Sequence, residues 1–170
     1  MAVIEAIATT YLEAGVVSVT FSSIPQTYEH LQLRMSGRTN YGSRSGWTTL
    51  NGDTGGNYSA HRMGGSGSSV AAAGWGTLSY IIGPYLTGTN ASATEYSPSI
   101  VDILDYANTN KNTTLMYATY TQGGPDVFFG SALWDSTAAV TSITYTEGAG
   151  GSHVITRGSV FTLYGLNSAN

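Results

Sequence analysis

The side chains that most often carry acid–base or metal chemistry are scattered through this sequence. Its three histidines, His30, His61 and His153, lie in separate segments and form no HExxH or other paired spacing. A metal site or a catalytic triad needs such groups at defined spacings, so we predict ordinary surface or turn histidines. Ser66, in GGSGS, does not match a nucleophile elbow because Ser68 stands where the second glycine belongs. We therefore expect no enzymatic activity.

Carboxylates and amides form two further patterns. Asp102 and Asp105 stand three residues apart in a predicted strand, so they should point to opposite faces and cannot form the acid pair of a glycosidase. Asn51, Asp53 and Asn57 share one glycine-rich turn that resembles the start of a calcium loop, but the bidentate Glu that should follow is absent. Either these side chains bind a cation or, as we expect, they cap their own backbone. We predict no metal and no cofactor.

Aromatic residues offer another kind of site. Rings that are exposed on loops stack on sugars in lectin-like folds, so they are candidate loop contacts for a host-surface glycan. The alternative, which we favour, is that these rings cover the ends of the fold or pack at a contact between subunits. Five of them lie in or near the glycine-rich middle of the chain: Trp47, Trp75, Tyr80, Tyr85 and Tyr96.

The sequence pattern predicts that short β-strands position these residues. Apolar and polar residues alternate from Val16 to Ile24 and again from Leu31 to Arg38. Period two with one apolar side is typical of a half-buried strand. Pro25 has no backbone N–H and biases the residue before it toward an extended conformation, so the first strand should end there. We predict two strands joined by a corner, with these residues on their apolar sides: Val17, Val19, Phe21, Leu31, Leu33 and Met35.

Short strands and turns continue to the carboxyl end. We count eight to ten strands, roughly 8 to 15 residues apart and with no amphipathic helix between them, which favours an all-β antiparallel sandwich or barrel. Residues 16–170 should form this single domain. The last strand, within Ser159–Leu166, should be central, because an edge strand ending in VFTLYGL would invite uncontrolled pairing.

Residues 1–15 form an apolar segment ahead of the predicted domain. This segment is either the edge strand of the domain, which we favour, or an arm that docks on a neighbouring subunit. Its apolar residues are the candidate contacts with a capsid or with other copies of the chain: Val3, Ile4 and Ile7.

Two stretches in the middle of the chain carry turn signals. Asn51-Gly52 follows a predicted strand that begins at Trp47, and this dipeptide is a strong hairpin signal. Ser68–Pro98 mixes one apolar run, Leu78–Ile82, with many small residues. We predict a loop-rich insertion there, which is where a rigid β-scaffold usually places its contacts.

The charge balance narrows the range of partners. The 170 residues include 6 basic and 10 acidic side chains, and only 9% are charged. Nucleic-acid surfaces depend on clustered Lys and Arg, so we predict no nucleic-acid partner. No stretch approaches ~18 consecutive apolar residues, so we predict no membrane partner either. So low a charge density predicts that much of the surface is buried against other copies or another protein.

The sequence as a whole resembles a group of virion proteins of tailed bacteriophages. In that group a small β-sandwich recurs in capsid decoration proteins, head fibres and tail-associated proteins. The likeness extends from about Val16 to Leu166 and depends on five segments in a constant order: SSIPQTYEHLQLRMSGRT, NGDTGGNYSAHRMGGSGS, IVDILDYANTNK, LWDSTAAVTSITYTEGAGG and GSVFTLYGL.

This resemblance implies a jelly-roll-like virion component without enzymatic activity, with trimers the favoured oligomer. Its partners would be the major capsid protein or other virion subunits. Because the chain has no long fibre-forming stalk, we expect a capsid decoration, or cement, protein on the head surface. The alternative is a receptor-binding or glycan-binding module of a head fibre or of a tail fibre or spike.

Overall fold

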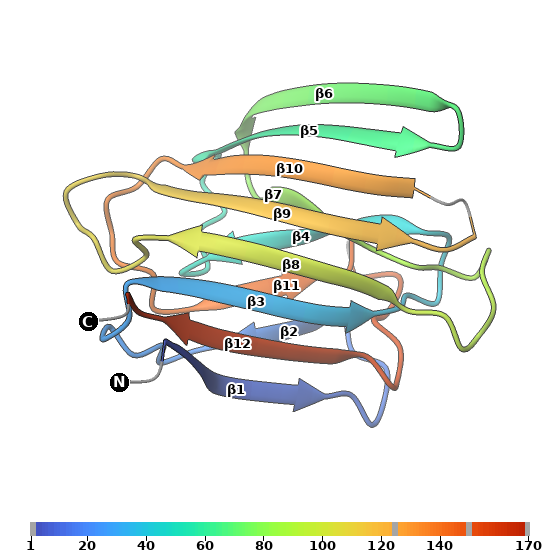
Figure 1. Ribbon diagram of the computed structural model, residues 1–170, viewed down its shortest axis with the longest axis horizontal. Helices are drawn as coiled ribbons and strands as arrows, with labels where there is room; N and C mark the ends of the chain where they lie inside the picture. The colour runs from blue at the N-terminus through green and yellow to red at the C-terminus, as the bar shows by residue number, and fades with distance from the viewer. Residues whose placement is uncertain (1–2, 124–125, 149–150, 169–170) are drawn as a thin grey trace.

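The structure, a computed structural model, describes residues 3–123, 126–148 and 151–168, and in these ranges it contains twelve β-strands and no helix. The strands form two antiparallel sheets that pack face to face (Figure 1). In spatial order the larger sheet contains β1 (Ile4–Tyr11), β12 (Val160–Leu166), β3 (His30–Gly37), β8 (Ser97–Leu104), β9 (Thr113–Thr121), β10 (Asp126–Trp134), β5 (Tyr58–Ser66) and β6 (Ser69–Leu78). The smaller sheet contains β2 (Ser18–Phe21), β11 (Ile143–Thr146), β4 (Arg44–Leu50) and β7 (Ile81–Leu86).

Eight of the strands make a jelly-roll sandwich. The order β1-β12-β3-β8 in one sheet faces β2-β11-β4-β7 in the other, so most connections cross between the sheets. The remaining four strands, β5–β6 and β9–β10, extend the larger sheet beyond β8. The predicted antiparallel, jelly-roll-like sandwich is confirmed. The strand count exceeds the predicted eight to ten because Ser68–Pro98, predicted to be rich in loops, contains β6 and β7. No described segment is a helix of the length and hydrophobicity that crossing a membrane requires.

Alternation along the strands places the core between the sheets. Leu31, Leu33 and Met35 of β3 point inward and are at most 5% exposed. From the facing sheet, Val19 and Phe21 of β2 are similarly buried. The predicted inward positions of these five residues are therefore correct.

The first predicted strand is longer than the strand that forms. It spans Ser18–Phe21 as β2 rather than running from Val16 to Ile24. Val17 precedes it and is 39% exposed, so its predicted inward position is wrong. Ile24 is buried, but its N–H donates to the carbonyl oxygen of Thr141, 3.0 Å away, outside the ladder.

The N-terminal segment forms an edge strand rather than a free arm. Residues 4–11 pair antiparallel with β12, which consequently lies inside the sheet, as predicted for the last strand. Val3 and Ile4 are exposed, whereas Ile7 is half-buried and packs against the core. Met1 and Ala2 lie outside the described residues.

Asn51-Gly52 does not make the predicted hairpin. Both residues adopt left-handed φ values, 53° and 67°, as the turn signal requires. However, the turn connects β4 of the smaller sheet to β5 of the larger one, and these strands do not pair. The dipeptide determined the local turn, whereas the sheet that the chain joins next depends on long-range packing.

The predicted loop-rich insertion, Ser68–Pro98, contains two strands, β6 and β7. β6 is the edge of the larger sheet and packs mainly on β5, so most of its residues are exposed on both faces (Figure 1). A strand without a buried side needs no apolar alternation, and this explains why the small residues of Ser69–Gly76 gave no strand signal.

Candidate functional site

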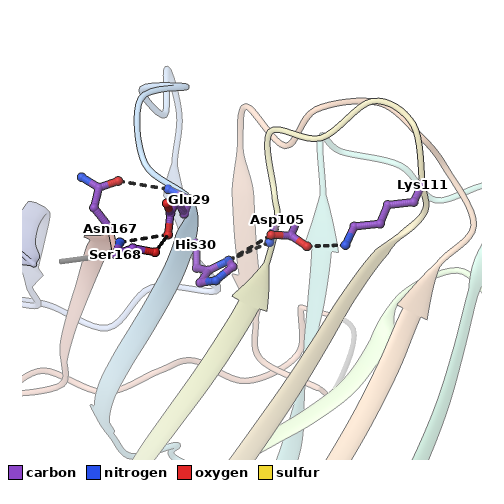
Figure 2. Close-up of polar contacts among 6 residues, drawn as sticks. All are labelled: Glu29, His30, Asp105, Lys111, Asn167 and Ser168. Atoms are coloured by element: carbon purple, nitrogen blue, oxygen red, sulfur yellow. Dashed lines mark hydrogen bonds and ion pairs between the residues drawn. The ribbon is translucent and has the colours of Figure 1, made fainter. Parts of the chain in front are cut away.

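A cluster of polar side chains lies at one end of the sandwich (Figure 2). His30 begins β3, and Asp105 follows the end of β8 with a left-handed φ of 49°. The Lys111 ammonium forms an ion pair with Asp105 Oδ2. The hydrogen bond that the Lys111 ammonium donates in this ion pair is the main reason why the pKa of Asp105 lies below its usual value of 3.8.

The His30 imidazole contacts the turn that follows β8. Its Nδ1 atom accepts a hydrogen bond from the main-chain N–H of Asp105, at 3.0 Å. Asp105 Oδ1 lies 3.4 Å from the same atom. His30 therefore joins β3 to the turn after β8.

Glu29 anchors the carboxyl-terminal residues to the same end. Its Oε2 atom accepts hydrogen bonds from the main-chain N–H and the hydroxyl of Ser168, and these bonds lower its pKa. Asn167 Oδ1 in turn accepts the N–H of Glu29 at 3.2 Å. The groups drawn in Figure 2 thus connect the start of β3 with the turn after β8 and with the residues that follow β12. Their contacts hold these three chain segments together.

The side chains of the calcium-like turn, which contains Asn51, Asp53 and Asn57, form hydrogen bonds within the protein. Asp53 Oδ1 accepts the N–H of Gly55 at 2.8 Å, and Oδ2 accepts Asn57 Nδ2 at 2.9 Å and Trp134 Nε1 at 2.7 Å. These bonds lower the pKa of Asp53, and the bond from Asn57 has the largest effect on it. Asn51 Oδ1 accepts the N–H of Thr141 at 2.8 Å, which fastens the turn to a distant segment. The bond between Asp53 and Gly55 caps the backbone of the turn itself. In the part of the chain that the structure describes, no three His, Cys, Asp or Glu side chains are grouped so that they could hold a metal ion.

The remaining candidate groups do not converge. Asp102 lies on the outer face of β8, where its Oδ1 accepts Gln32 Nε2 at 2.7 Å, whereas Asp105 lies in the following turn. His153 stacks on Tyr41 with ring centroids 4.1 Å apart. His61 lies on the outer face of β5, and Ser66 ends that strand.

The five candidate aromatic residues are distributed over strands as well as loops. Trp47 in β4 stacks on Tyr80 with centroids 4.2 Å apart. Tyr85 in β7 stacks on Phe128, also at 4.2 Å. The structure adds Arg62, which sequence reasoning missed. Its guanidinium lies 5.0–5.3 Å from three ring centroids, those of Trp75, Tyr85 and Phe128.

Tyr96 is the fifth candidate and lies in the connection before β8, where its hydroxyl donates to the carbonyl of Arg157 at 2.9 Å. Tyr80 and Tyr96 lie in connections, whereas the predicted loop position is wrong for Trp47, Trp75 and Tyr85, which belong to strands. Whether any of the five contacts a partner stays a prediction.

Large apolar side chains gather on the outer face of the larger sheet. Met63, Met116 and Phe129 are each more than half exposed. Strand register places Phe129 directly beside Met63 on one side and Ala118 on the other. We call this surface the apolar face and define it by five exposed residues of four neighbouring strands: Met63, Ile100, Met116, Val127 and Phe129.

Shallow hollows accompany these side chains. One of about 580 Å³ lies over β10, β5 and β6 and is lined by residues that include Met63 and Phe129. Another, of about 420 Å³, lies over β3, β8 and β9 beside Ile100 and Val127. The apolar face therefore has both protrusions and depressions.

The sequence contained a partial signal for this face. Apart from Asp102, the residues of Ile100–Leu104 are apolar on both sides of the strand, and this strand, β8, lies inside its sheet. Periodicity cannot tell whether the second apolar side of a strand is covered, because the answer depends on what packs against the outside of the sheet. No protein-family model matches this chain, and no curated protein matches it significantly.

Proposed function

We propose that this chain is a structural subunit of a bacteriophage particle, and specifically a capsid decoration protein that binds the head surface as an oligomer. The observation that carries the proposal is the apolar face. Exposed apolar patches of this kind mark interaction surfaces in soluble proteins, because water disfavours them until a partner covers them. The jelly-roll fold and the five segments that resemble phage virion proteins support the same function.

The proposed mechanism is mechanical. A symmetric oligomer sits over a junction between shell subunits and adds contact area that must be broken before those subunits can separate. Because the decoration protein binds the assembled shell and not the separated shell subunits, its binding shifts the equilibrium toward the assembled shell. Such a subunit needs a rigid scaffold and adhesive surfaces rather than a reactive centre.

The test is the copy number of the chain in purified phage particles that contain it, measured by quantitative mass spectrometry. A decoration protein should be present in hundreds of copies, and particles that lack it should release DNA at a lower temperature. A count of a few to a few dozen copies, with label confined to the tail or to fibres, would contradict the proposal.

The alternative is a glycan-binding module of a fibre or spike. Trp75 is half-buried rather than buried and lies beside the Arg62 guanidinium, a pairing that suits sugar stacking. Binding on a glycan array that is lost in Trp75→Ala and kept in Trp47→Ala would favour this function over decoration.

A further inference from the structure

We propose that the apolar face is covered by another copy of this chain, so that the protein self-associates through the outer side of its larger sheet. This inference deepens the proposed function by naming the partner of one surface. It can nevertheless be tested on the purified protein, without a phage particle.

The size of the sheet fits a stable contact between copies. The apolar face belongs to four strands of eight or nine residues each. At about 4.8 Å between strands and ~3.3 Å per residue, these four strands cover roughly 19 by 28 Å, or roughly 530 Å². With the flanking strands β3 and β6 of the same sheet the area rises to roughly 800 Å², which is the area that each partner buries in a standard protein–protein interface. A second copy that covers the apolar face and these two strands can therefore form a stable contact.

The polar groups beside the apolar face are already paired within the chain. Arg34 Nε donates to Gln32 Oε1 at 2.7 Å, and Gln32 Nε2 donates to Asp102 Oδ1 at 2.7 Å. The Arg34 guanidinium also lies 4.9 Å from the centroid of the Tyr164 ring. Burial of a charge is costly when it loses its partners, and here a covering subunit would leave this chain of hydrogen bonds intact.

Charge and shape favour a copy over a different partner. The chain has a formal net charge of −4, so identical copies repel each other in general. Beside the apolar face, Arg34 and Asp102 carry opposite charges and are linked through Gln32, so this group adds no net charge to the contact. The protruding Phe129 and Met63 side chains lie beside hollows of the same face, as a self-complementary contact between identical subunits requires. A lipid surface would instead call for a cluster of basic residues.

The experiment compares two matched variants by sedimentation velocity between 1 and 100 µM. Val127 on the apolar face and Val17 away from it are both 39% exposed, so Val127→Asp and Val17→Asp introduce the same charge at equal exposure. We expect wild-type oligomers and at least a tenfold weaker association in Val127→Asp and in Phe129→Asp. Val17→Asp should associate like the wild type.

A second measurement applies if the charged variants fail to fold. The chain has no cysteine, so Met116→Cys and Val17→Cys each provide a single thiol. We expect maleimide to label the Met116→Cys thiol at least tenfold more slowly at 100 µM than at 1 µM protein, and the Val17→Cys thiol equally at both concentrations.

Two results would overturn the inference: a wild-type monomer at 100 µM, or identical behaviour of the two members of either variant pair. A monomer that is nevertheless found in hundreds of copies per particle would leave the decoration function standing, with the shell rather than a copy of the chain as the partner of the apolar face. Oligomers of the predicted kind that are absent from phage particles would support self-association and would contradict the decoration function.

Discussion

At the scale of single residues, the polar side chains of this protein serve mainly to hold its turns. Asp53 illustrates the point, because both of its oxygens accept hydrogen bonds, one of them from the indole of the buried Trp134. The sequence made this turn look like an incomplete cation loop. The structure gives it a different role, in which the carboxylate fastens the turn before β5 to the end of β10.

We expect Asp53→Asn to destabilise the protein by about 1 kcal/mol at pH 7, because the amide offers one acceptor oxygen in place of two. The pKa of Asp53 is lowered in the folded state, so its stabilising effect is present above its usual pKa of 3.8 and is lost as the pH falls through the folded-state pKa. The difference between Asp53→Asn and the wild type should therefore shrink from pH 7 to pH 2.5 in urea unfolding experiments.

The control for this prediction is Glu13→Gln. Glu13 forms a solvent-exposed ion pair with Arg157, at 3.7 Å, and such pairs contribute little to stability. Its free energy of unfolding should match the wild type at both pH values. A destabilisation by Asp53→Asn that is as large at pH 2.5 as at pH 7 would show that the carboxylate charge is not what stabilises the turn.

At the scale of the elements, the strands approach one another closely where glycine replaces a side chain. Gly46 of β4 lies under the ring of Tyr145, and a Cβ atom built on this glycine would come within 2.1 Å of the ring. Tyr145 cannot easily move away, because it is buried and its hydroxyl donates to the carbonyl of Pro84 at 2.9 Å. The packing of β4, β7 and β11 thus depends on this one missing side chain.

We expect Gly46→Ala to lower the free energy of unfolding by about 3 kcal/mol, at the upper end of the cost of overpacking, because the Tyr145 ring must move or lose its hydrogen bond. Gly76→Ala in β6 is the matched control, since nothing lies within 4 Å of its added Cβ atom. The control should be neutral or slightly stabilising, because alanine reduces the entropy of the unfolded chain. Equal midpoints of urea unfolding for the two variants would disprove this account of the β4 packing.

At the scale of the whole molecule, the two sides of the larger sheet differ. Its inner side packs against the smaller sheet, while its outer side presents the apolar face. The molecule therefore has one sheet surface that serves as its own core and another that is apolar and exposed. This asymmetry is the physical basis for proposing an adhesive, assembling subunit.

Self-association through the apolar face predicts that thermal stability depends on concentration. Binding that occurs in the native state alone raises the unfolding temperature with protein concentration. We expect the wild-type unfolding midpoint to rise by several degrees between 1 and 100 µM in differential scanning fluorimetry. The midpoint of Phe129→Asp should stay constant over the same range, and a constant midpoint for the wild type would contradict self-association.

The sequence by itself determined the strands of the sandwich and the character of its turns. Alternation in Leu31–Met35 and the corner at Pro25 are local properties, because side-chain direction and the loss of a backbone donor depend on neighbouring residues. The same reasoning placed Asp102 and Asp105 on opposite faces of one strand, but Asp102 lies in β8 and Asp105 lies in the turn that follows it.

The tertiary structure alone decided which strands became neighbours and which apolar side stayed uncovered. Asn51-Gly52 makes its local turn, yet the chain then enters the other sheet, and Phe129 alternates like a core residue but points to solvent. The pairing of distant strands depends on contacts across the whole chain, and periodicity reports that a side is apolar without reporting what lies against it. The smaller sheet packs on the inner side of the larger one, so the apolar residues on the outer side remain available to a partner.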